Sequence, residues 1–379
     1  MKIGVIKEST PGELRVAMVP DTVKQMLKIG HSFFIETGAG QIAGYPDTLY
    51  TQAGATLVSR QEAASADILL QVRGPSANPA NGAADLDLMH AKQIIVALLD
   101  PLGASTAVAK LAEYQLTTFA LELLPRITRA QSMDVLSSMA NLAGYKAVLL
   151  AANNAPRIFP LMITAAGTLK AAKVLVLGAG VAGLQAIATA KRLGAVVEAY
   201  DVRPEVREQV YSVGGKFIDL ALDTSNLSDQ SGYAKEQTAE HLAKQQEALA
   251  QYVRNADVII TTALIPGRRA PILLTKAMMQ GMKPGAIIVD LAAEQGGNCA
   301  LTKAGEIIFI DDVQIIGPLN LTSSMATHAS QLYAKNIANF VQNLCDQQGQ
   351  LNINLDDPII NSTLITRDGA IVNSRLKPL

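Results

Sequence analysis

Three glycines, Gly178, Gly180 and Gly183, have a spacing that can hold phosphate groups. An apolar run, Val174–Leu177, precedes them, and a helical pattern over Val181–Leu193 follows. The first glycine of such a turn allows a tight bend, the second lets a pyrophosphate approach the backbone, and the third lets the helix pack on the strand. Free N–H groups at the helix start attract the phosphates. This context predicts a dinucleotide-binding turn rather than an ordinary glycine turn in an α/β core.

An acidic residue ends the next predicted strand, Val196–Tyr200, because Asp201 lies 18 residues after Gly183. A carboxylate at this point can accept hydrogen bonds from both ribose hydroxyls of NAD, and it repels the 2′-phosphate of NADP. Arg203 complicates the assignment, since a nearby arginine is the usual adaptation to NADP. Because Asp201 stands at the strand end itself, the sequence favours NAD(H) over NADP(H). We then expect Arg203 to lie over the adenine.

A second loop, Thr261–Gly267, follows the predicted strand Val258–Thr261. In a doubly wound sheet, ligands bind at the carboxyl ends of the strands, near the reversal of strand order. We therefore expect Ala263 and Leu264 to line the nicotinamide half of the site. The alternative is an ordinary loop of a large core.

The stretch Asp219–Glu240 is polar and precedes a predicted helix that runs to about Arg254. Loops longer than about 12–15 residues in compact domains are usually functional or disordered. Its length alone is equally compatible with a functional loop and with a plain surface insertion.

These motifs must be positioned by short β-rich runs that alternate with helical patterns along almost the whole chain. Strands are predicted at Ile3–Ile6, Phe33–Ile35, Ile68–Val72, Ile94–Leu98, Thr117–Ala120, Val174–Leu177, Val196–Tyr200, Val258–Thr261, Ile287–Asp290, Ile307–Ile310 and Val313–Ile316. Long helices are predicted at Ser132–Asn153 and Ser323–Cys345, and two short strands in the tail Leu351–Leu379. Strands separated by helical patterns imply crossover connections and parallel sheets.

The sequence therefore predicts an α/β fold of two doubly wound Rossmann-like domains with mostly parallel sheets, joined by long helices. The first domain comprises residues 1–131 and 330–379, because the second long helix returns the chain to it. The nucleotide-binding domain comprises residues 132–329, including the connecting helix and the loop 219–240.

Composition excludes several classes of protein. The chain has 379 residues, a net charge of −1, 49% apolar residues and a mean hydropathy of +0.22. The near-neutral charge argues against nucleic acid as a partner. No apolar stretch reaches the roughly 20 residues that a membrane-spanning helix needs without a glycine or a charge. The two cysteines and four histidines show no ligand spacing, so no metal site is predicted: Cys299, Cys345, His31, His90, His241 and His328.

A family resemblance is carried by four segments: Pro125–Ser137, Gly178–Gly183, Ser231–Glu236 and Thr261–Pro271. They resemble the NAD(H)-binding component, called domain I, of proton-translocating nicotinamide nucleotide transhydrogenase. The start of the chain, Gly4–Glu8 with Glu13–Pro20, resembles the wider family shared with alanine dehydrogenase. The likeness covers essentially the whole chain, and its most specific portion is Arg126–Ser137.

The resemblance implies direct hydride transfer from NADH held by this chain to NADP⁺ held by a separate domain III. A membrane domain II would couple the reaction to proton translocation, so the enzyme would act only with its partners. The resemblance also implies a homodimer, formed through the nucleotide domain, at the cytoplasmic face of the inner membrane. Such a transfer moves no proton at the reacting carbons, so it needs close approach and ring orientation rather than a general acid or base.

The family's site contains Arg, Gln, Asp and Ser in the loop before the long helix, and the matching residues are Arg126, Gln131, Asp134 and Ser137. Arg126 and Gln131 are expected to grip the carboxamide and the ribose or pyrophosphate oxygens. Asp134 and Ser137, three residues apart, would share one face of the helix start. Without the resemblance, these polar residues indicate plain helix capping.

The polar stretch matches the family's mobile loop, which closes over bound NAD(H) as a gate, with Tyr233 as the contact and Gly232 beside it. The candidate catalytic residues are then Arg126, Gln131, Asp134, Ser137 and Tyr233. The candidate cofactor-binding residues are Arg126, Arg129, Gln131, Gly178, Gly180, Val181, Ala182, Gly183, Asp201, Val202, Arg203, Gly232, Ala263 and Leu264.

Two alternatives are open. Alanine dehydrogenase needs a general base and a cation for the substrate carboxylate. Arg15 matches its substrate arginine, and Arg73 stands where that enzyme has a lysine, but the strand Gln93–Asp100 lacks the expected histidine. Glu294 also replaces its catalytic aspartate. The other alternative is an NAD-binding module without chemistry, which the segment Arg126–Ser137 argues against.

Overall fold

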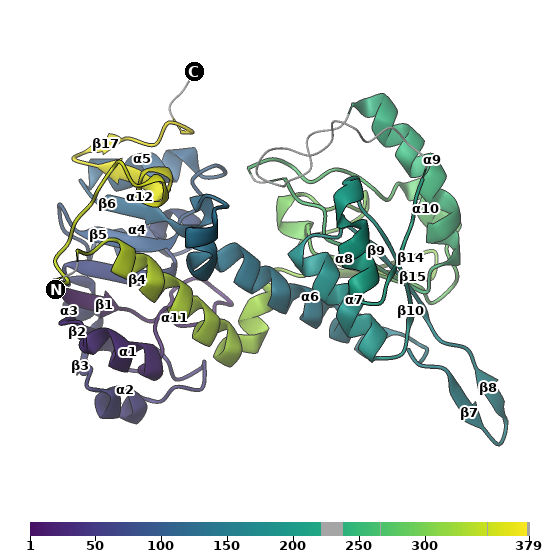
Figure 1. Cartoon of the computed structure of the whole chain (residues 1–379), viewed down its shortest axis with the longest axis horizontal. Helices are drawn as coiled ribbons and strands as arrows, with labels where there is room; N and C mark the ends of the chain where they lie inside the picture. Colours follow the sequence, from purple (N-terminus) through teal and green to yellow (C-terminus); the bar gives the residue numbers. More distant parts are fainter. Residues whose placement is uncertain (221–237, 266, 347, 377–379) are drawn as a thin grey trace. The chain divides into compact units, whose positions relative to one another are not determined.

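The computed structural model describes residues 1–220, 238–265, 267–346 and 348–376, and the chain divides into two units (Figure 1). Unit 1 comprises Met1–Met139 and Thr322–Leu379, and unit 2 comprises Ala140–Leu321. Each unit is built on its own mostly parallel sheet covered by helices. The predicted α/β fold of two Rossmann-like domains is therefore confirmed.

Unit 1 contains an eight-stranded sheet in the order β17-β16-β6-β5-β4-β1-β2-β3. Its strands are β1 (Lys2–Val5), β2 (Ser32–Glu36), β3 (Thr56–Val58), β4 (Ile68–Arg73), β5 (Ile94–Leu98), β6 (Thr117–Ala120), β16 (Leu364–Arg367) and β17 (Ala370–Ile371). The strands β1 to β6 are parallel, whereas β16 and β17 join antiparallel at one edge. Strand order reverses between β1 and β4, where a doubly wound sheet opens a crevice at its carboxyl edge.

Helices cover this sheet, and two of them begin at a residue whose side chain caps the helix. The helices of unit 1 are α1 (Pro20–Leu27), α2 (Asp47–Ala53), α3 (Arg60–Ala64), α4 (Gly82–Leu86), α5 (Ser105–Glu113), α11 (Ala326–Asn343) and α12 (Pro358–Thr363). Ser59 forms a capping box with Glu62 at the start of α3, and Asp357 caps α12. Residues of α5 such as Leu111 pack on Ile95 of β5 in the core.

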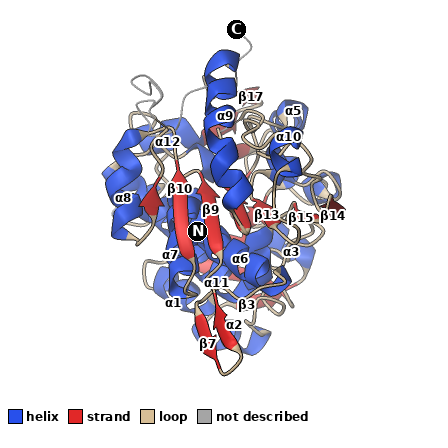
Figure 2. Ribbon diagram, turned by 90° about the vertical axis from the view of Figure 1, so that its right-hand side faces the viewer, coloured by secondary structure: helices blue, strands red, loops and turns tan. Residues whose placement is uncertain are grey.

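Unit 2 contains a seven-stranded sheet in the order β11-β10-β9-β12-β13-β15-β14, and Figure 2 shows β9 and β10 side by side. Its strands are β9 (Lys173–Leu177), β10 (Val196–Tyr200), β11 (Lys216–Phe217), β12 (Val258–Thr261), β13 (Ile287–Asp290), β14 (Ile307–Ile310) and β15 (Val313–Ile316). All pairs are parallel except β14 with β15. Strand order reverses between β9 and β12, which predicts a ligand site at their carboxyl ends.

Alternate residues of β9 enter two different cores. Val174 and Val176 pack with side chains of α6, α7 and α8, whereas Leu175 and Leu177 pack with α9 and α10. The helices are α6 (Val135–Asn154), α7 (Val181–Arg192), α8 (Arg207–Ser212), α9 (Ala239–Asn255) and α10 (Lys276–Gln280). A strand that is buried on both faces needs a continuous apolar run. This run is why β9 could be predicted from the sequence.

The helix α6 differs from its prediction in two ways. It begins at Val135 rather than Ser132, because Thr128–Met133 forms a 3₁₀ helix first. Among the described residues it is also long and apolar enough to cross a membrane, by length and composition alone. The length of this helix was predicted, but it was not counted as a possible membrane span, because Gly144 and Lys146 interrupt its apolar run. The helix of a domain core meets the same criterion, and Ala147 and Val148 of α6 are fully buried in unit 2.

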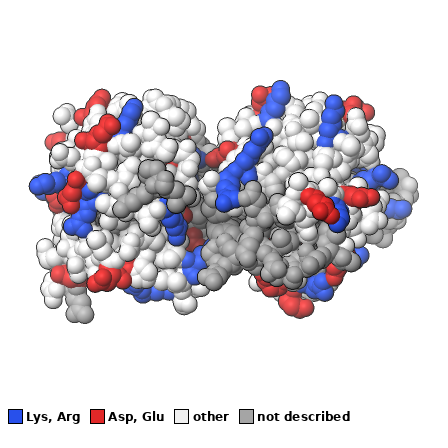
Figure 3. Space-filling view, turned by 90° about the horizontal axis from the view of Figure 1, so that it is seen from above, with Lys and Arg blue, Asp and Glu red and all other residues white. Residues whose placement is uncertain are grey.

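A short hairpin was missed by the sequence analysis. Strands β7 (Met162–Thr164) and β8 (Gly167–Leu169) pair antiparallel and project from the rest of unit 2 (Figures 1 and 2). Every residue of both strands is exposed, so no alternation of buried and exposed positions marks them. On the face of the molecule in Figure 3, Lys and Arg are interspersed with Asp and Glu, as the net charge of −1 leads us to expect.

Candidate dinucleotide site

The turn after β9 is held between two neighbouring strands. Gly178 has a φ of +98°, in the left-handed region that favours glycine. Its N–H donates to the Tyr200 carbonyl oxygen (2.8 Å), and its own carbonyl oxygen accepts from Thr262 Oγ1 (3.0 Å). A Cβ at Gly178 would lie 2.6 Å from Thr262 Oγ1. The first glycine of the motif is therefore required by the geometry of this turn.

The helix α7 packs closely on both the turn and α6. A Cβ at Gly183 would lie 1.9 Å from the Gly178 carbonyl oxygen, so only glycine fits at the third position. A Cβ at Gly144 of α6 would lie 2.1 Å from the carbonyl oxygen of Ala182 in the first turn of α7. The position of the α7 N-terminus is thus set by two close backbone approaches.

The N-terminus of α7 is open at the middle glycine. Gly180 is the capping residue, and the nearest atom to a Cβ built on it is Arg203 Nη2, at 3.9 Å. Val181, the first residue of the helix, is 37% exposed. A helix of 12 residues with an accessible start, whose capping residue Gly180 makes no side-chain hydrogen bond, can receive a phosphate group on its N–H groups. These features fit the pyrophosphate of a dinucleotide.

Asp201 and Arg203 form a closely bonded pair at the end of β10. The Asp201 carboxylate, 8% exposed, accepts from the N–H of Ala179 (2.7 Å). It also accepts from the N–H and Nε of Arg203 (both 2.9 Å) and from Arg203 Nη2 (2.8 Å). Val202, between them, is buried. The arginine that the sequence placed over the adenine therefore lies on the acidic residue, where it takes up bonds that ribose hydroxyls would need.

Two residues behind the second loop were missed by sequence reasoning. Asn298 Oδ1 accepts from the N–H of Ala263 (3.0 Å), and its Nδ2 donates to the carbonyl oxygens of Ala263 and Pro271 (both 2.8 Å). Asp290, fully buried at the end of β13, accepts from the N–H of Asn298 (2.8 Å) and from Thr261 Oγ1 (2.8 Å). An aspartate that ends a buried strand was the available signal. Ala263 is half-buried and Leu264 is 37% exposed.

Among the described candidates, those of unit 2 gather at the switch point between β9 and β12, whereas Arg126, Arg129, Gln131, Asp134 and Ser137 belong to unit 1. There, Arg126 and Gln131 are exposed, and Asp134 and Ser137 are half-buried. Asp134 Oδ1 accepts from the N–H of Ser137 (2.9 Å), and Ser137 Oγ donates to Asp134 Oδ2 (2.5 Å). This is helix capping at the start of α6, the arrangement that these residue types favour without any ligand.

Arg129 forms an ion pair with another residue of unit 1. Its guanidinium forms an ion pair with Asp357, in which Nη2 donates to Oδ1 and Nη1 donates to Oδ2 (3.0 Å). Asp357 in turn accepts from Asn343 Nδ2 (3.0 Å). The remaining candidates, Gly232 and Tyr233, lie outside the described residues, as does most of the loop 219–240.

The cations proposed for an amino-acid substrate face a buried carboxylate. Arg15, 3% exposed, donates through Nε to Glu13 Oε1 (2.7 Å) and through Nη2 to Glu13 Oε2 (2.6 Å). Arg73 Nε lies 3.5 Å from the same Glu13 Oε2. Glu294, the residue in place of the dehydrogenase aspartate, accepts from the N–H of Asn320 (2.6 Å). Glu13 thus partly neutralises the charge that a substrate carboxylate would need.

A second carboxylate, that of the half-buried Glu8, lies beside this pair at the carboxyl edge of β4. Glu8 accepts from the N–H groups of Val72 (2.6 Å) and Arg73 (3.1 Å). Burial and the nearby charge of Glu13 raise the pKa of Glu8 from 4.5 to about 8. Sequence reasoning did not single out Glu8. A glutamate shortly after a predicted strand is normally expected to be exposed to solvent. Within the residues that the structure describes, no group of three or more His, Cys, Asp or Glu side chains could hold a metal ion.

A Gly178–Gly183 turn at a switch point, with an acidic residue ending the next strand, defines the class: a two-domain Rossmann-like protein of the NAD-binding dehydrogenase type. Residues 4–143 match the model of the alanine dehydrogenase/PNT N-terminal domain, and residues 147–374 match the C-terminal domain. The chain belongs to this alanine dehydrogenase/PNT family.

Relatives and solved structures agree with this assignment. The chain is 46% identical to the first part of NAD(P) transhydrogenase subunit alpha of Rhodospirillum rubrum, over 99% of both chains. It is 43% identical to the protein of the same name from Rickettsia prowazekii, over 98% of this chain and 96% of the relative. The crystal structure of transhydrogenase from Sinorhizobium meliloti has a TM-score of 0.87 and 44% identity, covering 98% of this chain and 100% of that one.

Proposed function

We propose that this chain is the NAD(H)-binding component of a proton-translocating transhydrogenase. The observation that supports this most is the 46% identity, over 99% of both chains, to the first part of an NAD(P) transhydrogenase subunit alpha. Its partners are then an NADP(H)-binding domain and a membrane domain, through which it sits at the cytoplasmic face of the inner membrane. Neither nucleic acid nor a metal ion has a role in this proposal.

In unit 2, the N-terminus of α7 receives the pyrophosphate across Gly180, and Asp201 binds the ribose hydroxyls of NAD(H). Ala263, held by Asn298, and the exposed Leu264 line the nicotinamide half. When bound, NADH supplies a hydride that reduces NADP⁺ on the partner domain. The chain's own contribution is to hold the ring in the correct orientation, because no proton moves at the reacting carbons.

In unit 1, the polar residues at the start of α6 orient the reacting end of the nucleotide. Arg126 and Gln131 supply donors for the carboxamide and the ribose or pyrophosphate oxygens. Asp134 and Ser137 fix the first turn of α6 through their paired hydrogen bonds. Tyr233 and Gly232, which lie outside the described residues, are the remaining candidate contacts of the bound nucleotide.

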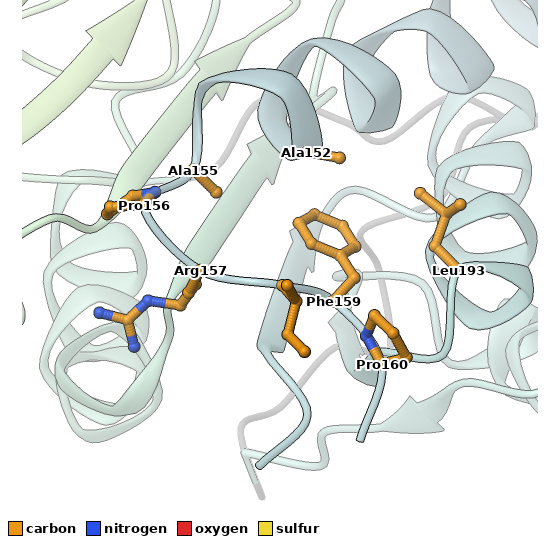
Figure 4. Close-up of a pocket in the computed structure, with 8 residues that line it drawn as sticks. Ala152, Ala155, Pro156, Arg157, Phe159, Pro160 and Leu193 are labelled. Atoms are coloured by element: carbon orange, nitrogen blue, oxygen red, sulfur yellow. The ribbon is translucent and has the colours of Figure 1, made fainter. Parts of the chain in front are cut away.

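A homodimer through unit 2 belongs to the same proposal. The hairpin β7–β8 carries exposed apolar side chains at Ile163 (77%) and Leu169 (51%). A two-stranded hairpin without a core of its own is at best marginally stable, so packing against a second copy would stabilise it. A depression of about 480 Å³ is lined mainly by the residues that precede the hairpin in the sequence. Phe159 and Leu193 border it (Figure 4). Its apolar lining suits the same contact.

The proposed function is tested by mixing the chain with NADH, NADP⁺ and an isolated NADP(H)-binding partner domain, and by following NADPH formation. Hydride transfer that requires both proteins is the expected result. NADH oxidation that depends on pyruvate and ammonia, without transfer to NADP⁺, would replace the proposal with alanine dehydrogenase. Tight NADH binding without either reaction would leave a binding module.

The same assay predicts how the unit 1 residues act. Asp134→Asn and Arg126→Ala are each expected to lower the hydride-transfer rate by about 10²-fold, the effect of misplacing reacting groups. The dissociation constant of NADH, measured by calorimetry, should change much less, because most binding contacts belong to unit 2. Equal losses in rate and in affinity for each variant would contradict the orienting role. Asn361→Ala, an exposed change in unit 1, is the control.

A further inference from the structure

The carbonyl oxygen of Ser132 is held by two side chains from consecutive turns of α11. Asn336 Nδ2 donates to it at 2.8 Å, and Asn339 Nδ2 donates to it at 3.0 Å. Residues three apart on a helix share one face, so both amides reach the same carbonyl without distortion. Ser132 lies two residues before Asp134 and five before Ser137.

One of these two amides, that of Asn336, has a buried oxygen without a hydrogen-bond partner in the part of the chain that the structure describes. Asn336 is 6% exposed, and its Oδ1 is buried without a hydrogen-bond partner among the described residues. A buried polar atom that has no hydrogen-bond partner destabilises the folded state. In this orientation Asn336 Nδ2 donates to the Ser132 carbonyl oxygen, while Asn336 Oδ1 accepts no hydrogen bond from the described residues.

A second set of contacts holds the same segment three residues earlier. Asp357 binds the Arg129 guanidinium with both carboxylate oxygens and also accepts from Asn343, the last residue of α11. Arg129 Nη1 donates to Asn343 Oδ1 as well (3.2 Å). Asp357 is fixed in turn, because it caps α12 through the N–H of Ile359 (2.9 Å).

The segment needs such support because of its own conformation. Thr128–Met133 is a 3₁₀ helix of six residues, and runs of this helix longer than three or four residues are uncommon. Its hydrogen bonds have poorer geometry than those of an α-helix, so its own backbone does not fix it firmly. Hydride transfer depends on ring placement, and a shift of about 1 Å can lower a rate about 10²-fold.

We propose that Asn336, Asn339 and Asn343 of α11, with the Arg129–Asp357 pair, form a positioning clamp that fixes the segment 126–137 for hydride transfer. This inference rests on the proposed function of the chain. It makes Arg129 a positioning residue that acts through the segment, not a direct ligand of the nucleotide as the sequence analysis expected.

The test compares Asn339→Asp with Asn361→Asp. Both replace an asparagine that donates to a backbone carbonyl oxygen, Ser132 for Asn339 and Leu355 for Asn361, and both keep size while losing the donor. For Asn339→Asp we expect a drop in hydride-transfer rate of about tenfold, with the dissociation constant of NADH changed less than about twofold. Amide hydrogen exchange over residues 128–134 of the free chain should accelerate in Asn339→Asp and not in Asn361→Asp.

A double-mutant cycle tests the other half of the clamp. Arg129→Ala and Asp357→Asn should each slow hydride transfer, and the double variant should be no slower than the worse single variant, because both remove one interaction. A tenfold loss of NADH affinity in Arg129→Ala but not in Asp357→Asn would overturn the clamp in favour of direct nucleotide binding. Identical rates and exchange in Asn339→Asp and Asn361→Asp would also overturn it. If the unchanged chain transfers no hydride, the proposed function fails, and hydrogen exchange still decides whether the clamp holds the segment.

Discussion

In the proposed nucleotide site, Arg203 is the side chain expected to control the choice between NAD(H) and NADP(H). Arg203 donates to the Asp201 carboxylate through Nε (2.9 Å) and Nη2 (2.8 Å). Without these bonds the carboxylate would be open to ribose hydroxyls, and its repulsion of a 2′-phosphate would be less offset. Arg203→Ala is therefore expected to raise the preference for NADH over NADPH by about tenfold, or about 1.4 kcal/mol.

Calorimetric titration of the chain with each nucleotide measures this preference. Lys216→Ala is the control. Lys216 of β11 is exposed and forms an ion pair with Glu198 of β10, so this variant also removes a cation paired with a carboxylate of β10. An unchanged or reduced preference in Arg203→Ala would show that Arg203 assists the binding of NADH instead of competing with it.

Glu8 makes stability depend on pH in a definite direction. In the unfolded chain its carboxyl loses a proton near its ordinary pKa of 4.5, whereas burial and then the charge of Glu13 raise the folded pKa to about 8. The folded state binds more protons between these values, so the free energy of unfolding falls as pH rises through this window. The contribution of Glu8 is fully present below about pH 4.5 and is lost by about pH 8.

Glu8→Gln should remove one component of this slope, which approaches 1.4 kcal/mol per pH unit for one proton. Urea unfolding at pH 5.5, 6.5 and 7.5 measures the slope in both proteins. Glu122, whose pKa burial raises to about 7, keeps a slope of the same sign in the variant. Glu113→Gln, at an exposed position, is the control. A slope that Glu8→Gln leaves unchanged would contradict the assignment.

At the scale of elements, the close approach of α6 and α7 couples stability to nucleotide binding. A Cβ at Gly144 would lie 2.1 Å from the Ala182 carbonyl oxygen, a backbone atom that cannot rotate away. Gly144→Ala should lower the free energy of unfolding by about 1–3 kcal/mol, as overpacking does. It should also weaken NADH binding, because Ala182 belongs to the first turn of α7, where the proposed site holds the pyrophosphate.

Thermal unfolding and NADH titration of Gly144→Ala check both effects. Gly281→Ala is a matched change in the same unit, where the nearest atom to the new Cβ is the flexible Arg254 side chain at 3.3 Å. If both variants unfold at the same temperature and bind NADH equally, the two helices do not need this close approach.

Strands with a continuous apolar run could be predicted, including the exposed edge strand β14, whereas elements that depend on distant partners could not. β12, β13, β14 and β15 have the bounds that their apolar runs predict. The hairpin β7–β8 lacks buried positions, and the 3₁₀ helix before Val135 has no periodic signature of its own. The site followed the same rule: glycine spacing and a strand-end aspartate were visible, but Asn298 and the α11 asparagines act across long sequence separations.

For the whole molecule, composition limited the class and topology located the crevices, but association depends on surface features that sequence patterns do not reveal. The proposed homodimer makes a prediction about the hairpin. Ile163 is 77% exposed at the centre of β7, and a charge there would have to be desolvated in any interface that covers it. Ile163→Asp is therefore expected to shift the chain from dimer to monomer, and light scattering after size-exclusion chromatography measures the mass. Ile42→Asp is the matched control, because Ile42 is 58% exposed in unit 1. Equal masses for Ile163→Asp and the unchanged chain would remove the hairpin from the dimer interface, and a monomeric unchanged chain would contradict the homodimer itself.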